Sequence, residues 1–319
     1  MPNADWTEIL TTTLQSRNKE FADNVSNTNA LLARLNQKGN VKAATGGNVI
    51  IEELEYAENS TFQFYTGYEI LDISPSDVFT AAEFDWKQAS VNVSASGLEV
   101  EVQNTGKERV IPLLEKRIQN AKRTAANNMS TAVYSDGTGS SGKEIGGLQL
   151  LIADDPSTGI VGGIDRSDSA NSFWRNQTSG DATLTTSAHM RTEMQAMWLE
   201  TSRGKDTVDL IVTGQLFYSL FWDSLTDIQR ISSDTTATAG FESLRYVTAD
   251  VIYDGDSGIP TSTMYFLNTD YIYLRPHSNR NWVPMEKKSS VNQDAMVVPL
   301  VWAGNLTMSN GARQGVIWT

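Results

Sequence analysis

The pattern closest to a catalytic motif in this chain is a loop that contains glycine and lysine. Gly137, Gly142 and Lys143 have the spacing of the first seven residues of a phosphate-binding P-loop. The eighth position must offer a Ser or Thr hydroxyl to Mg²⁺, but it holds Glu144, whose carboxylate would repel phosphate. A P-loop also follows a strand, whereas a helix-like segment precedes this loop. Both departures argue against nucleotide binding.

Other groups that could do chemistry are sparse or have simpler explanations. Asp154-Asp155 and the turn 254–258 could hold a hard cation, but Asp and Gly are also the residues that tight turns select. The chain has no cysteine, and neither of its two histidines, His189 and His277, has a nucleophile motif nearby. No pair of carboxylates stands out among the many. We therefore predict no catalytic residue, no cofactor site and no metal site, and expect that the protein is not an enzyme.

Composition limits the partners of the chain. Its 319 residues can form two modest domains or one large domain with appendages. A formal charge of -13 disfavours nucleic-acid binding by bulk electrostatics, so any such contact must be local. The N-terminal residues show no signal-peptide pattern, and no apolar run approaches the roughly 20 residues of a membrane span. We expect no membrane partner.

The strongest periodic signal is a basic, helix-like run from Arg109 to Val133. Apolar residues recur in it every three to four positions, which places them on one helical face: Val110, Leu114, Ile118, Ala121, Ala125, Met129 and Val133. Lys116, Arg117, Lys122 and Arg123 make the segment unusually basic for an acidic chain. They form either a solvated face or, as we favour, a functional surface for DNA, an acidic assembly factor or a neighbouring subunit. Pro112 lies in the first turn or kinks the helix.

The segments before this helix differ in character. Residues 1–45 show interrupted helical periodicity, typical of an extended arm with helical pieces or of a partly disordered tail. Short β-rich segments follow at 49–51, 62–65, 91–93 and 98–102. A long two-stranded excursion of this kind is marginal alone in water and becomes sensible if a neighbouring subunit covers it.

A mixed α/β region is predicted after the flexible linker 136–142. Helices are expected around the Met190–Trp198 stripe and over 216–225, with strands at 208–212, 251–253, 264–267, 271–274, 297–302 and 316–318. Trp174 and Arg175 lie side by side in a Gly/Ser-rich loop. Trp174 either anchors this loop or, with Arg175, contacts another subunit, where Trp and Arg are enriched.

The order of these elements, together with several short phrases, resembles one protein family. The phrases are Gly162-Gly163-Ile164-Asp165-Arg166, Trp174-Arg175-Asn176, Gly240-Phe241-Glu242-Ser243-Leu244 and Asn305-Leu306-Thr307. The family is the major capsid proteins of tailed bacteriophages, with the Hong Kong 97-type fold. The resemblance implies an α+β architecture with an N-terminal arm at 1–46 and an extended β-hairpin loop at 47–97. It also implies a peripheral domain with a long spine helix at 98–144, a mixed α/β axial domain at 145–281 and peripheral return strands at 282–319.

The resemblance further implies assembly, not catalysis. Copies of the chain would form pentamers and hexamers of an icosahedral shell around double-stranded DNA, assembled in the cytoplasm of a bacterial host and found in the virion. Lys116, Arg117, Lys122 and Arg123 would face the interior and contact scaffold or DNA. Because only about 46 residues precede the hairpin, a separate scaffolding protein is expected. A portal protein is expected as well, with or without a decoration protein. No feature of the sequence identifies a Lys–Asn cross-link. The alternatives are an encapsulin-like compartment shell and a soluble monomeric hydrolase.

Overall fold

A computed structural model of the chain describes residues 29–99, 113–181, 183–225, 243–255, 258–285, 288–289 and 294–319. Its helices are α2 (Ala30–Lys38), α3 (Leu113–Ala132), α4 (Gly139–Gly142), α5 (Leu148–Leu151), α6 (Ser187–Thr201) and α7 (Gln215–Ser224), with 3-10 turns η2 (Ser169–Trp174) and η4 (Thr269–Tyr271). None of the helices in these ranges is long and apolar enough to cross a membrane.

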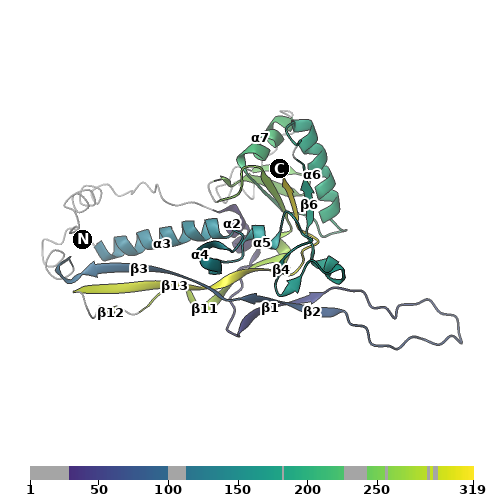
Figure 1. Cartoon of the computed structure of the whole chain (residues 1–319), viewed down its shortest axis with the longest axis horizontal. Coiled ribbons are helices and arrows are strands. Elements are labelled where there is room, and N and C mark those ends of the chain that lie inside the picture. Colours follow the sequence, from purple (N-terminus) through teal and green to yellow (C-terminus); the bar gives the residue numbers. More distant parts are fainter. Residues whose placement is uncertain are drawn as a thin grey trace.

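The strands form three main units, which Figure 1 shows as a long sheet beside α3, a second sheet under α6 and α7, and a projecting hairpin. They are β1 (Val49–Glu55), β2 (Phe79–Asp85), β3 (Lys87–Ser96), β4 (Ile160–Val161), β5 (Ile164–Asp165), β6 (Gln177–Gly180), β7 (Leu210–Thr213), β8 (Ser243–Tyr246), β9 (Ala249–Tyr253), β10 (Thr263–Leu267), β11 (Ile272–Pro284), β12 (Lys288–Ser289), β13 (Ala295–Met308) and β14 (Gly315–Trp318).

The long sheet is organised around β13, which pairs antiparallel with β3, β11 and β12. Helix α3 lies along β3, and its apolar face closes a small core with Val93 and Leu300. The predicted periodicity is confirmed, since Ala121, Ala125 and Met129 are buried. Within the described residues the helix begins at Leu113, so the role of Pro112 lies outside them.

The second sheet has six strands in the order β6-β14-β10-β7-β9-β8, with α6 and α7 on one face. Strand β7 is buried on both faces: Ile211 packs under the helices, while Leu210 and Val212 join the main core. The predicted methionine stripe is confirmed, because three methionines of α6, Met190, Met194 and Met197, are buried against this sheet.

The predicted strand at 62–65 is wrong, and so is the described start of the predicted strand at 98–102. Residues 62–65 lie in the loop between β1 and β2 and form no ladder, because no neighbouring strand among the described residues offers them hydrogen bonds. Leu98 and Glu99 also leave the sheet, where β3 ends at Ser96. There the Ser96 N–H donates to the Glu99 carboxylate at 3.1 Å and the Glu99 N–H donates to the Ser96 hydroxyl at 3.2 Å, which turns the chain. Residues 100–102 lie outside the described ranges.

Strand pairing also moves the expected segment boundaries. Strand β3 belongs to the long sheet, so the projecting hairpin is narrower than the expected range 47–97. Strand β11 crosses the expected boundary at 281–282. Strand β14 pairs with β10 and β6, so the last strand of the range 282–319 lies in the six-stranded sheet and not beside α3.

Candidate functional site

The most exposed feature of the molecule is the β1–β2 hairpin and the loop 56–78 that extends from it (Figure 1). The loop carries apolar side chains that are almost fully exposed, with Phe64 at 91%, Tyr68 at 104% and Ile70 at 95%. A surface of this kind marks an interaction site in a soluble protein. The sequence analysis expected a neighbouring subunit to cover this excursion, but it placed 62–65 in a strand and did not single out these exposed side chains.

Charge gives the hairpin a second distinguishing property. Residues 43–86 contain no Lys or Arg. They contain nine acidic residues: Glu52, Glu53, Glu55, Glu58, Glu69, Asp72, Asp77, Glu83 and Asp85. The combination of exposed aromatic residues with one sign of charge is readable from the sequence, and this signal could have located the surface before the structure.

A buried ion pair fastens the base of the hairpin to the long sheet. Glu52 on β1 is only 5% exposed and accepts two hydrogen bonds from Arg275 on β11, at 2.7 and 2.8 Å. The Thr307 hydroxyl on β13 donates to the same carboxylate at 2.7 Å. The pair raises the pKa of Arg275 through its hydrogen bonds to Glu52. A two-pronged bond of this type fixes direction as well as distance.

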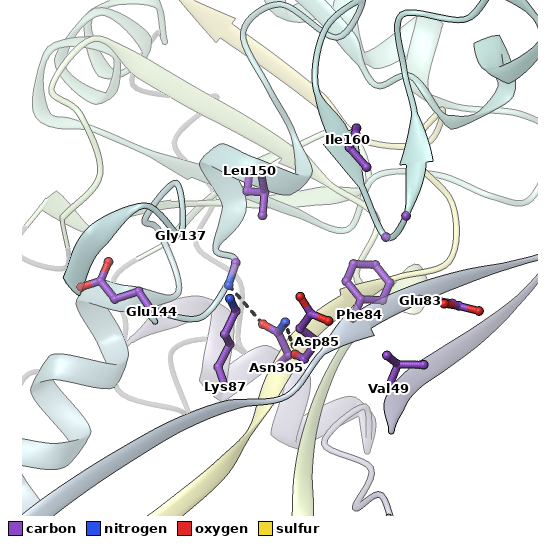
Figure 2. A pocket seen from close by; sticks show the side chains of 13 residues that line it. Val49, Glu83, Phe84, Asp85, Lys87, Gly137, Glu144, Leu150, Ile160 and Asn305 are labelled. Carbon is purple, nitrogen blue, oxygen red and sulfur yellow. Dashed lines mark hydrogen bonds between the residues drawn. The ribbon is translucent and has the colours of Figure 1, made fainter. Parts of the chain in front are cut away.

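A cavity of about 360 Å³ lies where the hairpin meets the body (Figure 2). Asn305 on β13 crosses its floor: its amide donates to the Asp85 carbonyl at 2.9 Å, and its carbonyl accepts from the Gly146 N–H at 3.1 Å. Lys87 donates to the Gly142 carbonyl at 2.8 Å. Through these hydrogen bonds, Asn305 and Lys87 connect the end of β2 and the start of β3 to the segment between α3 and α5.

The β4–β5 turn supports the hairpin from the other side. The Glu83 N–H donates to the Gly162 carbonyl at 2.8 Å. Gly162 has a φ of +59°, and a Cβ there would lie 2.9 Å from the Ala82 methyl group and 3.1 Å from the Phe84 ring. Only glycine combines this backbone conformation with so close an approach.

Trp174 and Arg175 both make contacts within the chain. The sequence predicted that they either anchor their loop or contact another subunit. Trp174 is 1% exposed and donates its indole N–H to the Val161 carbonyl at 2.9 Å, so it anchors the loop. Arg175 is half-buried and donates to the Arg166 carbonyl at 2.8 Å. A contact of these two residues with a neighbouring subunit stays a prediction, and for Trp174 it would require that a buried side chain leave its core.

Arg166 is fully buried beside this loop. Its guanidinium donates to the Leu150 carbonyl at 3.4 Å and to the Leu151 carbonyl, at the end of α5. Burial lowers the pKa of Arg166 to about 10. The carbonyl oxygens at a helix C-terminus partly offset the cost of burying this cation.

The four basic residues of α3 do not share one face. Helical spacing places Lys116 and Arg123 on the side opposite the apolar face, with Arg117 and Lys122 beside that face. Arg117 forms a bidentate ion pair with Glu99, at 2.9 and 3.2 Å, and the bond from Arg117 lowers the pKa of Glu99. Lys122 is exposed.

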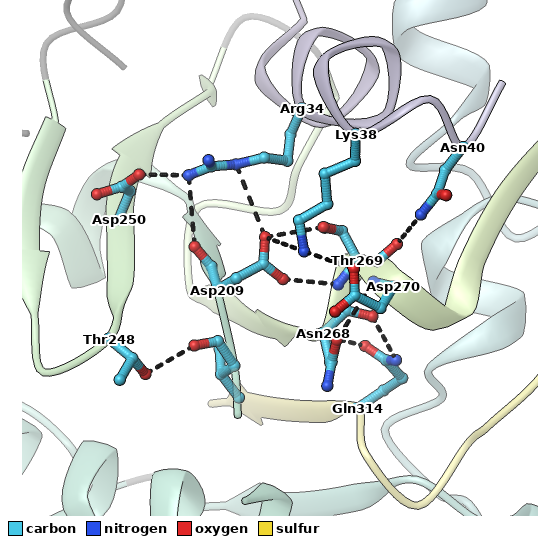
Figure 3. A network of polar contacts seen from close by, with 11 residues as sticks. Arg34, Lys38, Asn40, Asp209, Thr248, Asp250, Asn268, Thr269, Asp270 and Gln314 are labelled. Carbon is cyan, nitrogen blue, oxygen red and sulfur yellow. Dashed lines mark hydrogen bonds and ion pairs between the residues drawn. The ribbon is translucent and has the colours of Figure 1, made fainter. Parts of the chain in front are cut away.

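Helix α2 is fastened to the six-stranded sheet by a network of charges (Figure 3). Lys38 lies 3.2 Å from Asp209 and 2.8 Å from Asp270, and Arg34 pairs with Asp250. Asp209 also accepts bonds from the N–H and hydroxyl of Thr269, at 2.7 and 2.8 Å. The described part of the expected arm thus binds its own subunit.

Several of the groups weighed as catalytic candidates have structural contacts. Helix α3 precedes the loop that contains Lys143, so the strand that a P-loop requires is missing there. Asp254 is buried and accepts bonds from the Tyr134 hydroxyl at 2.7 Å and the Ala30 N–H at 3.1 Å. His277 packs edge-on against Trp86.

Comparison with known proteins gives the class of the fold. No protein-family model and no curated protein matches the sequence. Solved structures do match: the capsid of cyanophage A-1(L) with a TM-score of 0.64 and 15% identity over 94% of each chain, and the capsid of Myoviridae phage XM1 with 0.57 and 9% identity over 95% of this chain and 97% of that one. The procapsid of satellite phage P4, which includes a size determination protein, matches with 0.50 and 10% identity over 99% and 98%.

These likenesses extend over nearly the whole chain, whereas identity is low. They show that the chain has the mixed α/β fold of phage capsid proteins, the Hong Kong 97-type fold that the sequence resemblance predicted.

Proposed function

We propose that this chain is the major capsid protein of a tailed phage, and that its copies form the pentamers and hexamers of an icosahedral shell around double-stranded DNA. One combined observation carries the proposal. The likeness to a phage capsid structure covers 94% of the chain, and the hairpin, which is fastened at its base, exposes Phe64, Tyr68 and Ile70. Such a protein acts by assembly and needs no catalytic residue.

The hairpin supports a contact between different surfaces of two copies. The hairpin projects from one side of the subunit. In the proposed contact it docks on a different surface of the neighbouring copy, and not on the hairpin of that copy. Contacts between unlike surfaces generate closed rings when the rotation closes. Pentamers and hexamers are rings of this kind.

The remaining assignments follow from the same proposal. The subunit would consist of an arm, an extended hairpin, a peripheral part with α3 as its spine and an axial part under α6 and α7. Lys116, Arg117, Lys122 and Arg123 would face the interior and contact scaffold or DNA. A separate scaffolding protein is supported by the procapsid of satellite phage P4, which includes a further protein for size determination. A portal protein, with or without a decoration protein, would complete the virion, which would assemble in the host cytoplasm.

Electron microscopy of the expressed chain, alone and with candidate assembly partners from its source, tests the proposal. We expect shells, and expect that a variant with Phe64, Tyr68 and Ile70 changed to Ser yields free subunits. The matched control is Leu199→Ser, because Leu199 on α6 is 60% exposed but lies outside the hairpin. Shells formed equally well by the loop variant would contradict the assembly role of the hairpin.

The contents of purified particles separate the proposal from its alternatives. Packaged double-stranded DNA supports a virus, whereas an enclosed enzyme and no genome would indicate an encapsulin-like compartment. A chain that stays monomeric under every assembly condition would instead favour a soluble hydrolase.

A further inference from the structure

A cluster of three potential metal ligands lies where β6 passes into α6, away from the hairpin. Asp181 directly follows β6, and His189 and Glu193 are one turn apart on α6. The His189 Nε2 atom lies 3.1 Å from Asp181 Oδ2 and 3.7 Å from Glu193 Oε1. All three ligand atoms lie within 4.8 Å of one another, and all three residues are half-buried.

Both carboxylates are oriented by hydrogen bonds to their outer oxygens. Asp181 Oδ1 accepts from the Thr183 N–H and hydroxyl, each at 2.7 Å. Glu193 Oε2 accepts from the Ser179 hydroxyl at 2.7 Å. In each case the second oxygen is turned toward His189. Hydrogen bonds of this kind, made to the ligands by neighbouring groups, orient the ligands in established metal sites.

The spacing of the ligand atoms fits a small divalent ion. Bonds of about 2.0–2.1 Å in tetrahedral geometry require ligand atoms about 3.4 Å apart. The two distances from His189 Nε2, 3.1 and 3.7 Å, lie on either side of that value. Among the ion pairs of the described residues, neither carboxylate pairs with a Lys or Arg, and His189 is the one cationic partner that faces both.

We propose that Asp181, His189 and Glu193 bind one divalent transition-metal ion of the zinc class, through Oδ2, Nε2 and Oε1. Water completes the coordination, since the site is open to solvent. The ion links the end of β6 to the first turns of α6 and thereby stabilises the six-stranded sheet under its helices. The site goes beyond the capsid function and does not depend on it. The sequence analysis overlooked it, although His189-x-x-x-Glu193 places two ligands on one helical face.

The test uses the full chain, stripped of metal with a chelator and titrated with Zn²⁺ by calorimetry and with Co²⁺ by visible absorption. We expect one ion per chain, and a loss of affinity of at least tenfold in His189→Gln and in Asp181→Asn. His277→Gln is the matched control, because His277 is the only other histidine of the chain and packs against Trp86. It should bind like the wild type.

Thermal unfolding provides a second readout that does not require shells. At free Zn²⁺ one hundred times above the dissociation constant, the unfolding equilibrium constant should fall about one hundredfold in the wild type and in His277→Gln. With the affinity lowered tenfold or more, it should fall by no more than about elevenfold in His189→Gln. Absence of Zn²⁺ binding by the wild type, or equal affinity of the wild type and His189→Gln, would overturn the proposal and would show that the cluster is an ion pair only.

Discussion

Replacement of Glu52 by Gln tests whether the base of the hairpin is held by the ion pair. The substitution keeps the shape of the side chain and removes its charge. Arg275 would then face a neutral amide, and Thr307 would keep one acceptor. Because the Glu52 side chain is only 6% exposed, water cannot replace the lost carboxylate.

The expected cost follows from the burial of the two partners. Removal of one partner from a buried ion pair costs about 3–5 kcal/mol, because the other charge is left uncompensated. The Arg275 side chain is 22% exposed and remains partly hydrated. We therefore expect that Glu52→Gln lowers the free energy of unfolding by about 2–3 kcal/mol, just below that range.

Urea unfolding of disassembled subunits, followed by tryptophan fluorescence, measures this change. The matched control is Glu53→Gln, since Glu53 is the next residue of β1 and its side chain is exposed. A double-mutant cycle with Arg275→Met should show a coupling of about 1–3 kcal/mol, because the double variant buries no unpaired charge. A cost equal to that of Glu53→Gln, or strictly additive effects in the cycle, would refute the reasoning.

Three further perturbations probe other parts of the structure. Gly162→Ala should destabilise the chain by about 1–3 kcal/mol more than Gly159→Ala in urea unfolding, because both positions have positive φ but only Gly162 faces a close neighbour, Ala82; equal costs would contradict the clash. The pKa of Glu99 is lowered below its usual 4.5 in the folded chain, so its contribution is present above that value and lost as pH falls through the folded pKa. The stability difference between wild type and Glu99→Gln should therefore shrink on acidification from pH 6 to below 4, and a difference independent of pH would count against the pairing. Charge reversal of the four basic residues of α3 should impair assembly or DNA packaging and reduce its salt dependence, as measured by particle yield; normal particles would argue against an electrostatic role.

The sequence predicted the elements that depend on local pattern. The apolar face of α3 and the methionine stripe of α6 follow from helical periodicity, because each helix buries the side that its own sequence makes apolar. The helix expected before the loop that contains Lys143 is present as α3. These successes concern contacts over three or four residues.

The errors concern pairing between distant segments. Residues 62–65 have β-forming side chains but no partner strand, and propensity alone cannot reveal that absence. The apolar content of β14 predicted a strand without indicating which sheet would receive it. The burial of Trp174 depends on Val161 and on the loop around Arg166, none of which shows a periodic pattern.

The phrases that carried the family resemblance meet mostly at one place in the structure. Gly162 packs under Ala82 and Phe84, Trp174 holds the β4–β5 turn from behind, and Asn305 ties the end of β2 to Gly146. Most of the residues that carry the resemblance therefore have a structural role where the hairpin meets the body of the subunit. Their contacts do not indicate catalysis.

A rigid joint is what the proposed assembly surface requires. The exposed side chains of the loop gain free energy only when a neighbour covers them, and each degree of freedom left in the hairpin would add to the entropy lost on docking. The paired Glu52 and Arg275, the bridging Asn305 and the close approach at Gly162 remove that freedom at the base before any neighbour arrives. Looser attachment should then reduce assembly more than it reduces the stability of the isolated subunit. A Glu52→Gln subunit that stays folded under assembly conditions despite its lower free energy of unfolding, but no longer forms shells, would be the clearest sign of this division of roles.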